Sequence, residues 1–239
     1  MLYFRGCVVR EKLPGISNAT EKILKRAGID YNVLDNESCC GSFLMRTGFQ
    51  EDAEEVMKNN LQKLLAANEK TVLVSCAGCY NTLKNDYKAL FDVELNVMHT
   101  SELIKNLMDE GRIQIKPTEM TVTYHDPCHL GRHSGVYEEP RYVIKKTAEL
   151  VEMGRNRERS RCCGAGSGVK AAFPELALDV ADKRIQDAEN TEADILATTC
   201  SFCILNLENA LEKRRKRKDK GSDIRIMDLT ELVLMGIEQ

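Results

Sequence analysis

Residues 71–79 have the sequence TVLVSCAGC, an apolar run followed at once by a C-x2-C pair. A second stretch of the same kind, DILATTCSFC, occupies residues 194–203. Each apolar run predicts a buried strand, and each C-x2-C pair begins the helix after it. Ligands of parallel α/β sheets gather at the carboxyl ends of strands. Both cysteine pairs are therefore expected at such an edge.

The remaining cysteines extend this repeat over the whole chain. The first five follow C-x31-CC-x35-C-x2-C and the second five follow C-x33-CC-x36-C-x2-C, at offsets of 121 to 124 residues. Cys39-Cys40-Gly41 recurs as Cys162-Cys163-Gly164, and MHTSELI at 98–104 aligns with MDLTELV at 227–233. A repeat of this length indicates a duplicated domain. We expect one domain at residues 1–115 and another at 116–239.

Strand and helix signals alternate in both halves, which predicts parallel sheets flanked by helices. The expected strands are Leu2–Phe4 with Val8-Val9, Tyr31–Leu34, Thr71–Ser75, Val93–Met98, Thr121–His125, Asp194–Thr198 and Ile224–Met227. Two helices are expected to begin after the cap residues Ser17 and Ser101, and another lies around Arg141–Lys146. The other expected helices are Glu51–Ala67, Cys79–Phe91, Val169–Asn190, Cys203–Lys213 and Leu229–Met235. In Glu51–Ala67, the side chains of Val56, Leu61, Leu64 and Leu65 are expected to face inward. The predicted fold class is α/β: two Rossmann-like halves related by a pseudo-twofold axis, with both cysteine sets at their interface.

The composition excludes several classes of protein. The chain has 239 residues, 34 Lys+Arg against 37 Asp+Glu, and a net charge of −3, so it carries no overall basic footprint for nucleic acid. The longest apolar stretches are short or interrupted by charge, and no membrane span is expected. The N-terminus lacks the pattern of a secretory signal, and we expect a cytoplasmic protein. The basic run at 213–218 is interpreted as a solvated helix end, the alternative being a docking surface for an acidic partner.

The cysteines favour metal ligation. They make up about 4% of the chain, below the roughly 8–10% of small disulfide scaffolds. In a reducing compartment, clustered cysteines are more often metal ligands or redox groups. Five thiolates exceed the four positions of a structural zinc, and adjacent cysteines suit a polynuclear cluster. Iron–sulfur ligation is favoured, with zinc in one half or a set of redox dithiols as the alternatives.

The duplicated pattern resembles the cysteine-rich CCG domain that occurs twice in the B subunit of heterodisulfide reductase. Similar domains occur in its D subunit and in iron–sulfur subunits of lactate, glycolate and glycerol-3-phosphate oxidation systems. The stretch YHDPCHLGR at 124–132 also resembles a segment common in this family. The resemblance implies two non-cubane [4Fe-4S] clusters, one held by Cys7, Cys39, Cys40, Cys76 and Cys79, the other by Cys128, Cys162, Cys163, Cys200 and Cys203.

The resemblance also implies a function. It predicts an enzyme subunit that cleaves a heterodisulfide of the coenzyme M–coenzyme B type, as in methanogenesis. Cleavage takes two electrons, and two clusters facing one site could each supply one electron and bind one product thiolate. The chain lacks a ferredoxin-type C-x2-C-x2-C-x3-C run, so we expect a ferredoxin-like iron–sulfur subunit (the C subunit type) and an FAD subunit as partners. The alternative is a non-catalytic electron-transfer subunit of a lactate, glycolate or glycerol-3-phosphate oxidation complex.

Other residues near the cysteines are candidates for roles in the site. His129 and His125 are candidates for a proton donor or a hydrogen-bond donor to a cluster sulfide, and His133 is a weaker one. The alternative for these histidines is backbone hydrogen bonding and turn capping. Arg132 is a candidate for binding an anionic group of the substrate, unless it forms an ion pair with Glu138 or Glu139; Arg5, Lys12 and Arg46 could serve similarly. Gly164–Gly168 lacks the ending of a phosphate loop and is interpreted as a turn around a cluster.

Overall fold

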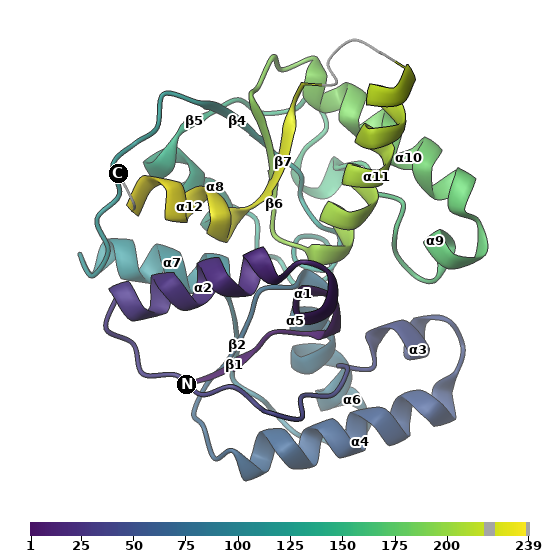
Figure 1. Ribbon diagram of the computed structural model, residues 1–239. Coiled ribbons are helices and arrows are strands. Elements are labelled where there is room, and N and C mark those ends of the chain that lie inside the picture. Colours follow the sequence, from purple (N-terminus) through teal and green to yellow (C-terminus); the bar gives the residue numbers. More distant parts are fainter. Residues whose placement is uncertain (218–222, 238–239) are drawn as a thin grey trace.

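A computed structural model describes residues 1–217 and 223–237, and it contains two fully parallel β-sheets (Figure 1). The first sheet has the order β1-β2-β3: Leu2–Phe4, Val72–Val74 and Val97–His99. The second has the order β5-β4-β6-β7: Glu149–Leu150, Thr121–Tyr124, Ile195–Thr198 and Arg225–Asp228. Apart from β5, the second sheet repeats the order of the first. The α/β class and the duplication are confirmed.

Helices follow the strands in both halves. In the first half they are α1 (Cys7–Lys12), α2 (Pro14–Arg26), α3 (Ser42–Arg46), α4 (Gln50–Ala66), α5 (Ala77–Asn81), a π-helical turn (Thr82–Asp86), α6 (Tyr87–Phe91) and α7 (Thr100–Asp109). In the second half they are α8 (Glu138–Thr147), a 3-10 turn (Arg157–Arg159), α9 (Val169–Ala172), α10 (Pro174–Glu189), α11 (Ser201–Arg217) and α12 (Leu229–Ile237). Across the described ranges, none of these helices has the length and apolarity that a bilayer span requires.

The two halves pack through helices that lie between the sheets (Figure 1). Helix α2 of the first half packs on α12 of the second, α7 packs on α8, and α7 also meets α12. In the repeat, α8 corresponds to α2 and α12 corresponds to α7. The contacts are therefore reciprocal, as a pseudo-twofold axis requires. Apolar side chains from both halves fill this interface, among them Leu24, Leu103, Val143 and Leu232.

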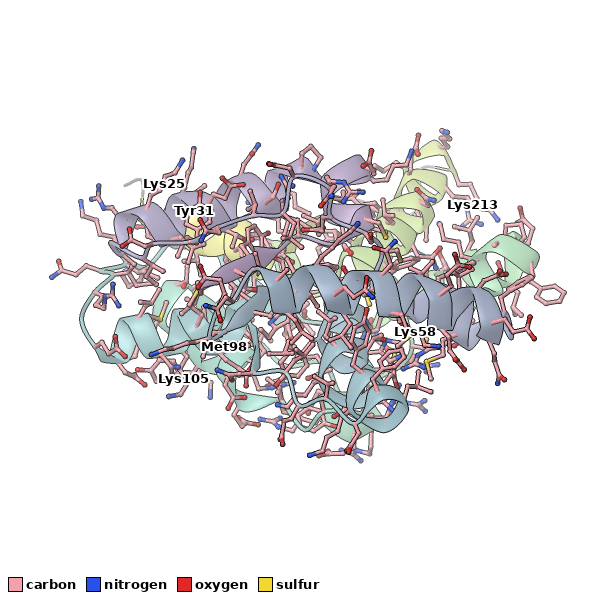
Figure 2. All side chains as sticks on the ribbon, turned by 90° about the horizontal axis from the view of Figure 1, so that it is seen from below. Lys25, Tyr31, Lys58, Met98, Lys105 and Lys213 are labelled. Atoms are coloured by element: carbon pink, nitrogen blue, oxygen red, sulfur yellow. The ribbon has the colours of Figure 1, made fainter. Side chains whose placement is uncertain are left out.

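Helices α4 and α10 are the outer helices that correspond to each other. Their buried positions match one by one at an offset of 124: Ala53, Met57, Asn60, Leu61 and Leu64 against Ala177, Ala181, Arg184, Ile185 and Ala188. Figure 2 views the molecule from the α4 side, where Lys58 lies on the surface. Both helices thus turn the same stripe toward the interior. Most of the paired positions are apolar or small in both helices, but one pairs Asn60 with Arg184.

Two expected strands were wrong. Val8 and Val9 lie in α1, because the chain turns at Gly6, which has a φ of +80°. The Tyr31–Leu34 segment forms only an isolated bridge, from Asn32 to Leu2. In that bridge, Tyr3 donates its backbone N–H to Asn32, and Asn32 donates its own to Met1. The strand expected at Val93–Met98 is confined to β3.

Several expected helix features were also wrong. Helix α2 begins at Pro14, so Ser17 lies inside it, and α7 is capped by His99 rather than by Ser101. The single helix expected at Val169–Asn190 is two helices, since Pro174 begins a new one. Leu65, expected to face inward, is 55% exposed.

The basic run at the end of α11 is ion-paired. Arg214 contacts both Asp182 and Glu189 on α10, and Lys213 contacts Glu175. Arg217 contacts Asp182 as well. These pairs attach part of the run to α10, while Arg215, Lys216 and Arg217 are exposed, as expected for a solvated helix end. Lys218, the last residue of the run, lies outside the described residues.

Candidate metal centre

All ten cysteines line one cleft between the two halves. The cleft contains about 860 Å³ of space not filled by atoms, part of it open to solvent. The remaining lining is mostly small or apolar and comes from both halves: Gly6, Val8, Ser42, Phe43, Arg46, Gly78, Pro127, His129, Ala165, Gly166, Ser167, Ser201 and Phe202. The prediction that both cysteine sets converge at the interface of the halves is confirmed.

The strand ends bring the first set together. Cys7 begins α1 just after β1, and Cys76 caps α5 just after β2, so parallel pairing places both at one sheet edge. The Sγ atoms of Cys7 and Cys39 lie 3.9 Å apart, and those of Cys79 and Cys40 lie 3.5 Å apart. All five are free thiols. The first set is therefore a compact group of sulfur donors.

The second set repeats this arrangement with one addition. Cys200 follows β6, and Cys203 lies in the first turn of α11. The Sγ atoms of Cys163 and Cys203 and a ring nitrogen of His125 all lie within 4.8 Å of one another. The histidine is thus a polar neighbour of the second set.

Cys76 and Cys200 line the cleft from the two halves, and the Cys200 thiol lowers the pKa of Cys76. Each of these residues follows the middle strand of its half, and the two are equivalent in the repeat. The pseudo-twofold axis therefore relates Cys76 to Cys200. Nε2 of His99, in the first half, donates a hydrogen bond of 3.2 Å to the backbone oxygen of Thr199 in the second.

Hydrogen bonds among the thiols lower the pKa of three of the cysteines. Hydrogen bonds from Cys40 and Cys7 lower the pKa of Cys39 to about 3. Hydrogen bonds from Cys162 and Cys203 lower the pKa of Cys163, and one from Cys200 lowers the pKa of Cys76. Thiolates are the form of cysteine that ligates metal. The lowered pKa values favour this form at Cys39, Cys76 and Cys163, whereas the pKa values of the other seven cysteines are raised.

The glycine of each Cys-Cys-Gly motif allows the chain to turn tightly. Gly41 has a φ of +85° and Gly164 a φ of +83°. Their N–H groups donate to the first sulfur of each motif, at 3.5 Å for Cys39 and 3.3 Å for Cys162. A Cβ on Gly164 would lie 2.4 Å from the Ala177 oxygen of α10. Gly166 and Ser167 line the cleft, as expected for a turn at the cysteines.

Buried carboxylates hold the loops that carry the cysteines. Glu37 accepts hydrogen bonds from the backbone N–H groups of Arg5 and Gly6, just before Cys7. Asp126, two residues before Cys128, accepts a bidentate pair of hydrogen bonds from Arg141 at 2.6 and 2.9 Å. Sequence reasoning missed Glu37, Arg141 and Arg184. A signal existed for the two arginines, since each interrupts the apolar stripe of an amphipathic helix.

The histidines near Cys128 occupy different positions. His125 is buried, and its Nδ1 accepts a hydrogen bond of 3.1 Å from Arg184. His129 lines the cleft and accepts a 3.3 Å hydrogen bond from Arg46 of the first half at Nε2. His133 is exposed and stacks at an angle on His129. Burial lowers the pKa of both His125 and His129, and Arg46 and His133 lower that of His129 further.

The candidate cations are held by partners. Arg132 is exposed and donates to the backbone oxygens of Glu158 and Ser160, in the loop before Cys162. Glu138, one of its expected partners, pairs with Arg157. Arg46 lines the cleft and forms a 2.8 Å ion pair with Asp86. Arg5 contacts Glu37, and Lys12 is exposed at the end of α1.

Comparison with known proteins gives relatives over the whole chain. The D subunit of dihydromethanophenazine:CoB–CoM heterodisulfide reductase from Methanosarcina acetivorans is 41% identical over 99% of this chain. The B subunit of fumarate reductase (CoM/CoB) from Methanothermobacter marburgensis is 37% identical over 98% of the chain. The chain spans 59% and 46% of the lengths of these two relatives. Among solved structures, Picrophilus torridus aspartate racemase matches with a TM-score of 0.43 and 12% identity, covering 99% of this chain and 91% of the racemase.

The family comparison matches residues 1–84 and 122–208 to CCG, the cysteine-rich domain. Each matched segment contains one complete set of five cysteines. The chain therefore belongs to the CCG cysteine-rich domain family, and it carries the domain twice.

Proposed function

We propose that this chain is the catalytic iron–sulfur subunit of a heterodisulfide reductase, acting on a disulfide of the coenzyme M–coenzyme B type. The observation that carries the proposal is the single cleft lined by two complete sets of five thiols. A substrate in that cleft would contact both sets at once. The similarity to a heterodisulfide reductase subunit supports the same function.

The donor set fits two iron–sulfur clusters. Each set contains five soft sulfur donors, two of them adjacent in sequence, which is one more than a tetrahedral zinc site takes. The buried Nε2 of His125 has no hydrogen-bond partner among the described residues, as expected where a cluster sulfur would complete the site. We infer that Cys7, Cys39, Cys40, Cys76 and Cys79 hold one non-cubane [4Fe-4S] cluster, and that Cys128, Cys162, Cys163, Cys200 and Cys203 hold the other.

The reaction is R–S–S–R′ + 2 e⁻ + 2 H⁺ → R–SH + R′–SH. Clusters held by the ten cysteines would supply the two electrons and offer iron as a Lewis acid for the product thiolates. The electrons come from a reduced iron–sulfur subunit that receives them from a flavin subunit. Those two subunits are the partners we propose.

The chain positions the substrate and stabilises the thiolates. His129 extends from the second half toward Gly78 of the first, where a Cβ on that glycine would lie 3.6 Å from Nδ1. Because Arg46 donates to Nε2, the ring proton of neutral His129 is on Nδ1. Nδ1–H can then donate a hydrogen bond to a sulfur as its negative charge develops. Arg46, which lines the cleft, is the proposed partner of an anionic group on the substrate. Arg132 is not among the residues that line the cleft, and its guanidinium holds the loop before Cys162 instead.

The test combines metal analysis with turnover. The chain is reconstituted anaerobically, iron and acid-labile sulfide are measured per chain, and thiols are counted after adding the heterodisulfide and a reduced viologen dye. We expect two clusters per chain and two thiols for each disulfide consumed. Zinc without iron or sulfide would overturn the cluster assignment. Intact clusters that exchange electrons with the dye but release no thiol would leave only the electron-transfer role.

A further inference from the structure

The two cysteine sets are nearly symmetric, but a buried hydrogen-bonded pair of side chains beside the second set has no equivalent beside the first. In the second half, the guanidinium of Arg184 donates from Nε to Nδ1 of His125 at 3.1 Å. Both side chains are almost fully buried, with exposures of 0% and 1%. An arginine can only donate hydrogen bonds, so Nδ1 has no proton. The proton of the neutral ring is therefore on Nε2.

The protonated nitrogen points to sulfur. Nε2 is buried and has no hydrogen-bond partner among the described residues. The sulfurs of Cys163 and Cys203 and a ring nitrogen of His125 lie within 4.8 Å of one another, and because Arg184 occupies Nδ1, we assign that nitrogen as Nε2. A protonated Nε2 has no lone pair with which to bind a metal. His125 is thus placed to donate a hydrogen bond toward the second sulfur set, and it is not a sixth ligand.

The first half has a different pair at the same place. The offset of 121 that relates Cys7 to Cys128 also relates Phe4 to His125, and the offset of 124 that relates the buried stripes of α4 and α10 relates Asn60 to Arg184. Phe4 and Asn60 are also fully buried. Asn60 donates to the hydroxyl of Tyr87, which in turn donates to the backbone oxygen of Cys40. The first half therefore has a phenylalanine in place of the imidazole donor and an asparagine in place of the guanidinium cation.

We propose that His125 and Arg184 make the second cluster easier to reduce than the first. The inference rests on the proposed iron–sulfur function. Reduction adds negative charge to a cluster, and an N–H donor to its sulfurs stabilises that charge and raises the reduction potential. Arg184, itself paired with Asp187, acts as a positioning residue that fixes the ring proton on Nε2. An electron entering the cleft therefore resides first on the second cluster.

The experiment exchanges the pair. His125→Phe/Arg184→Asn gives the second half the residues of the first. His125→Gln is the conservative variant, because its Oε1 can accept from Arg184 while its NH₂ donates toward the sulfurs. His133→Ala is the control, since His133 is an exposed histidine of the same segment. The measurements are iron per chain and an EPR-monitored redox titration of both clusters, with the exchangeable-proton coupling recorded in H₂O and D₂O.

We expect the double variant to keep its iron and to lower one of the two potentials. The change should be at least about tenfold in the reduction equilibrium, or about 59 mV for one electron. His125→Gln should restore most of the potential, and His133→Ala should leave both unchanged. Unshifted potentials, equal shifts of both clusters, or loss of half the iron in His125→Gln would overturn the proposal. None of these outcomes depends on turnover. If the two clusters have unequal potentials but the chain reduces no disulfide, the proposed reductase function is wrong and the inference about His125 and Arg184 still holds.

Discussion

At the scale of single residues, two arginines fix the proton positions of two histidines. Arg184 donates to His125 within the second half, and Arg46 donates to His129 across the interface of the halves. Each histidine keeps its N–H on the other nitrogen. The sequence pointed to both histidines because they flank Cys128. It could not assign their roles, since the arginines lie 59 and 83 positions away along the chain.

The first prediction concerns His129. Replacing it with leucine removes the Nδ1 donor but leaves Arg46 paired with Asp86. We expect heterodisulfide turnover to fall by about 100- to 1,000-fold, the usual effect of losing one preorganised donor, with iron content unchanged. His133→Leu is the matched control, because it changes the neighbouring ring. Equal activity losses in the two variants would contradict the role proposed for His129.

At the scale of elements, the repeat places a similar cap on two helices. In α7 the side chain of His99 accepts from the N–H of Ser101, and Glu102 accepts from the N–H of His99. In α12, Asp228 accepts from Thr230, and Glu231 accepts from the N–H of Asp228. Aspartate is a common N-cap and histidine is not. The second copy of the repeat could therefore have located the start of α7, which the sequence alone placed after Ser101.

The second prediction follows from the burial of Asp228. Burial raises its pKa to about 7, from an ordinary value of 3.8. A raised pKa means that the folded chain favours the protonated carboxyl, so stability is lost as the pH rises from about 4 to about 7. A difference of about three pH units corresponds to about 4 kcal/mol. Asp228→Asn keeps an oxygen that can accept from Thr230, and it should flatten this loss.

Thermal midpoints of wild type and Asp228→Asn at pH 5.0, 6.0, 7.0 and 8.0 check this expectation. The advantage of the asparagine variant should grow up to about pH 7 and then stay level. Exposed Asp179, changed to asparagine, serves as the control for the loss of one charge. A constant difference between Asp228→Asn and wild type across this range would show that the carboxyl does not titrate there.

At the scale of the whole molecule, the duplication made most of the architecture predictable. The ten cysteines and the strand ends beside them predicted two parallel α/β halves and a shared site. Details that depend on tertiary contacts were not predictable. Val8 and Val9 have strand propensity but lie in α1 after the turn at Gly6. Leu65 is exposed although it lies one turn after the buried Leu61.

The third prediction concerns the metal as part of the fold. The cleft lies between the halves, and the pKa values of Cys39, Cys76 and Cys163 are lowered there, so sulfur anions would repel one another without a cation. Removing iron anaerobically with a chelator should lower the thermal midpoint by more than about 10 °C, since 1 kcal/mol corresponds to about 2–4 °C at this chain length. Calorimetry before removal and after reconstitution measures this. An unchanged midpoint would show that the clusters contribute nothing to folding.

The last prediction asks whether the two sets bind metal independently. Cys79 and Cys203 are equivalent residues. Each is the second cysteine of a C-x2-C pair and is buried in the first turn of the helix that begins within the pair. In Cys203→Ser the second cluster should be lost or converted while the first persists, and Cys79→Ser should do the reverse. Iron should fall by about half in each variant, because each repeat is its own binding unit. Disulfide reduction should be almost wholly lost in both, since the two-electron step needs both clusters at one site.

The test is demanding because both sets line one cleft, and a change in one set can disturb the other. Iron per chain, EPR spectra and thiol release are measured in the same preparations, with the double variant as the reference that has lost a ligand from both sets. The spectra left in the two single variants should differ, because one arises beside Phe4 and the other beside His125. Complete loss of iron from either single variant would show that the halves depend on each other. Sustained turnover with one intact cluster would rule out the paired-cluster reaction, because a single cluster would then deliver both electrons.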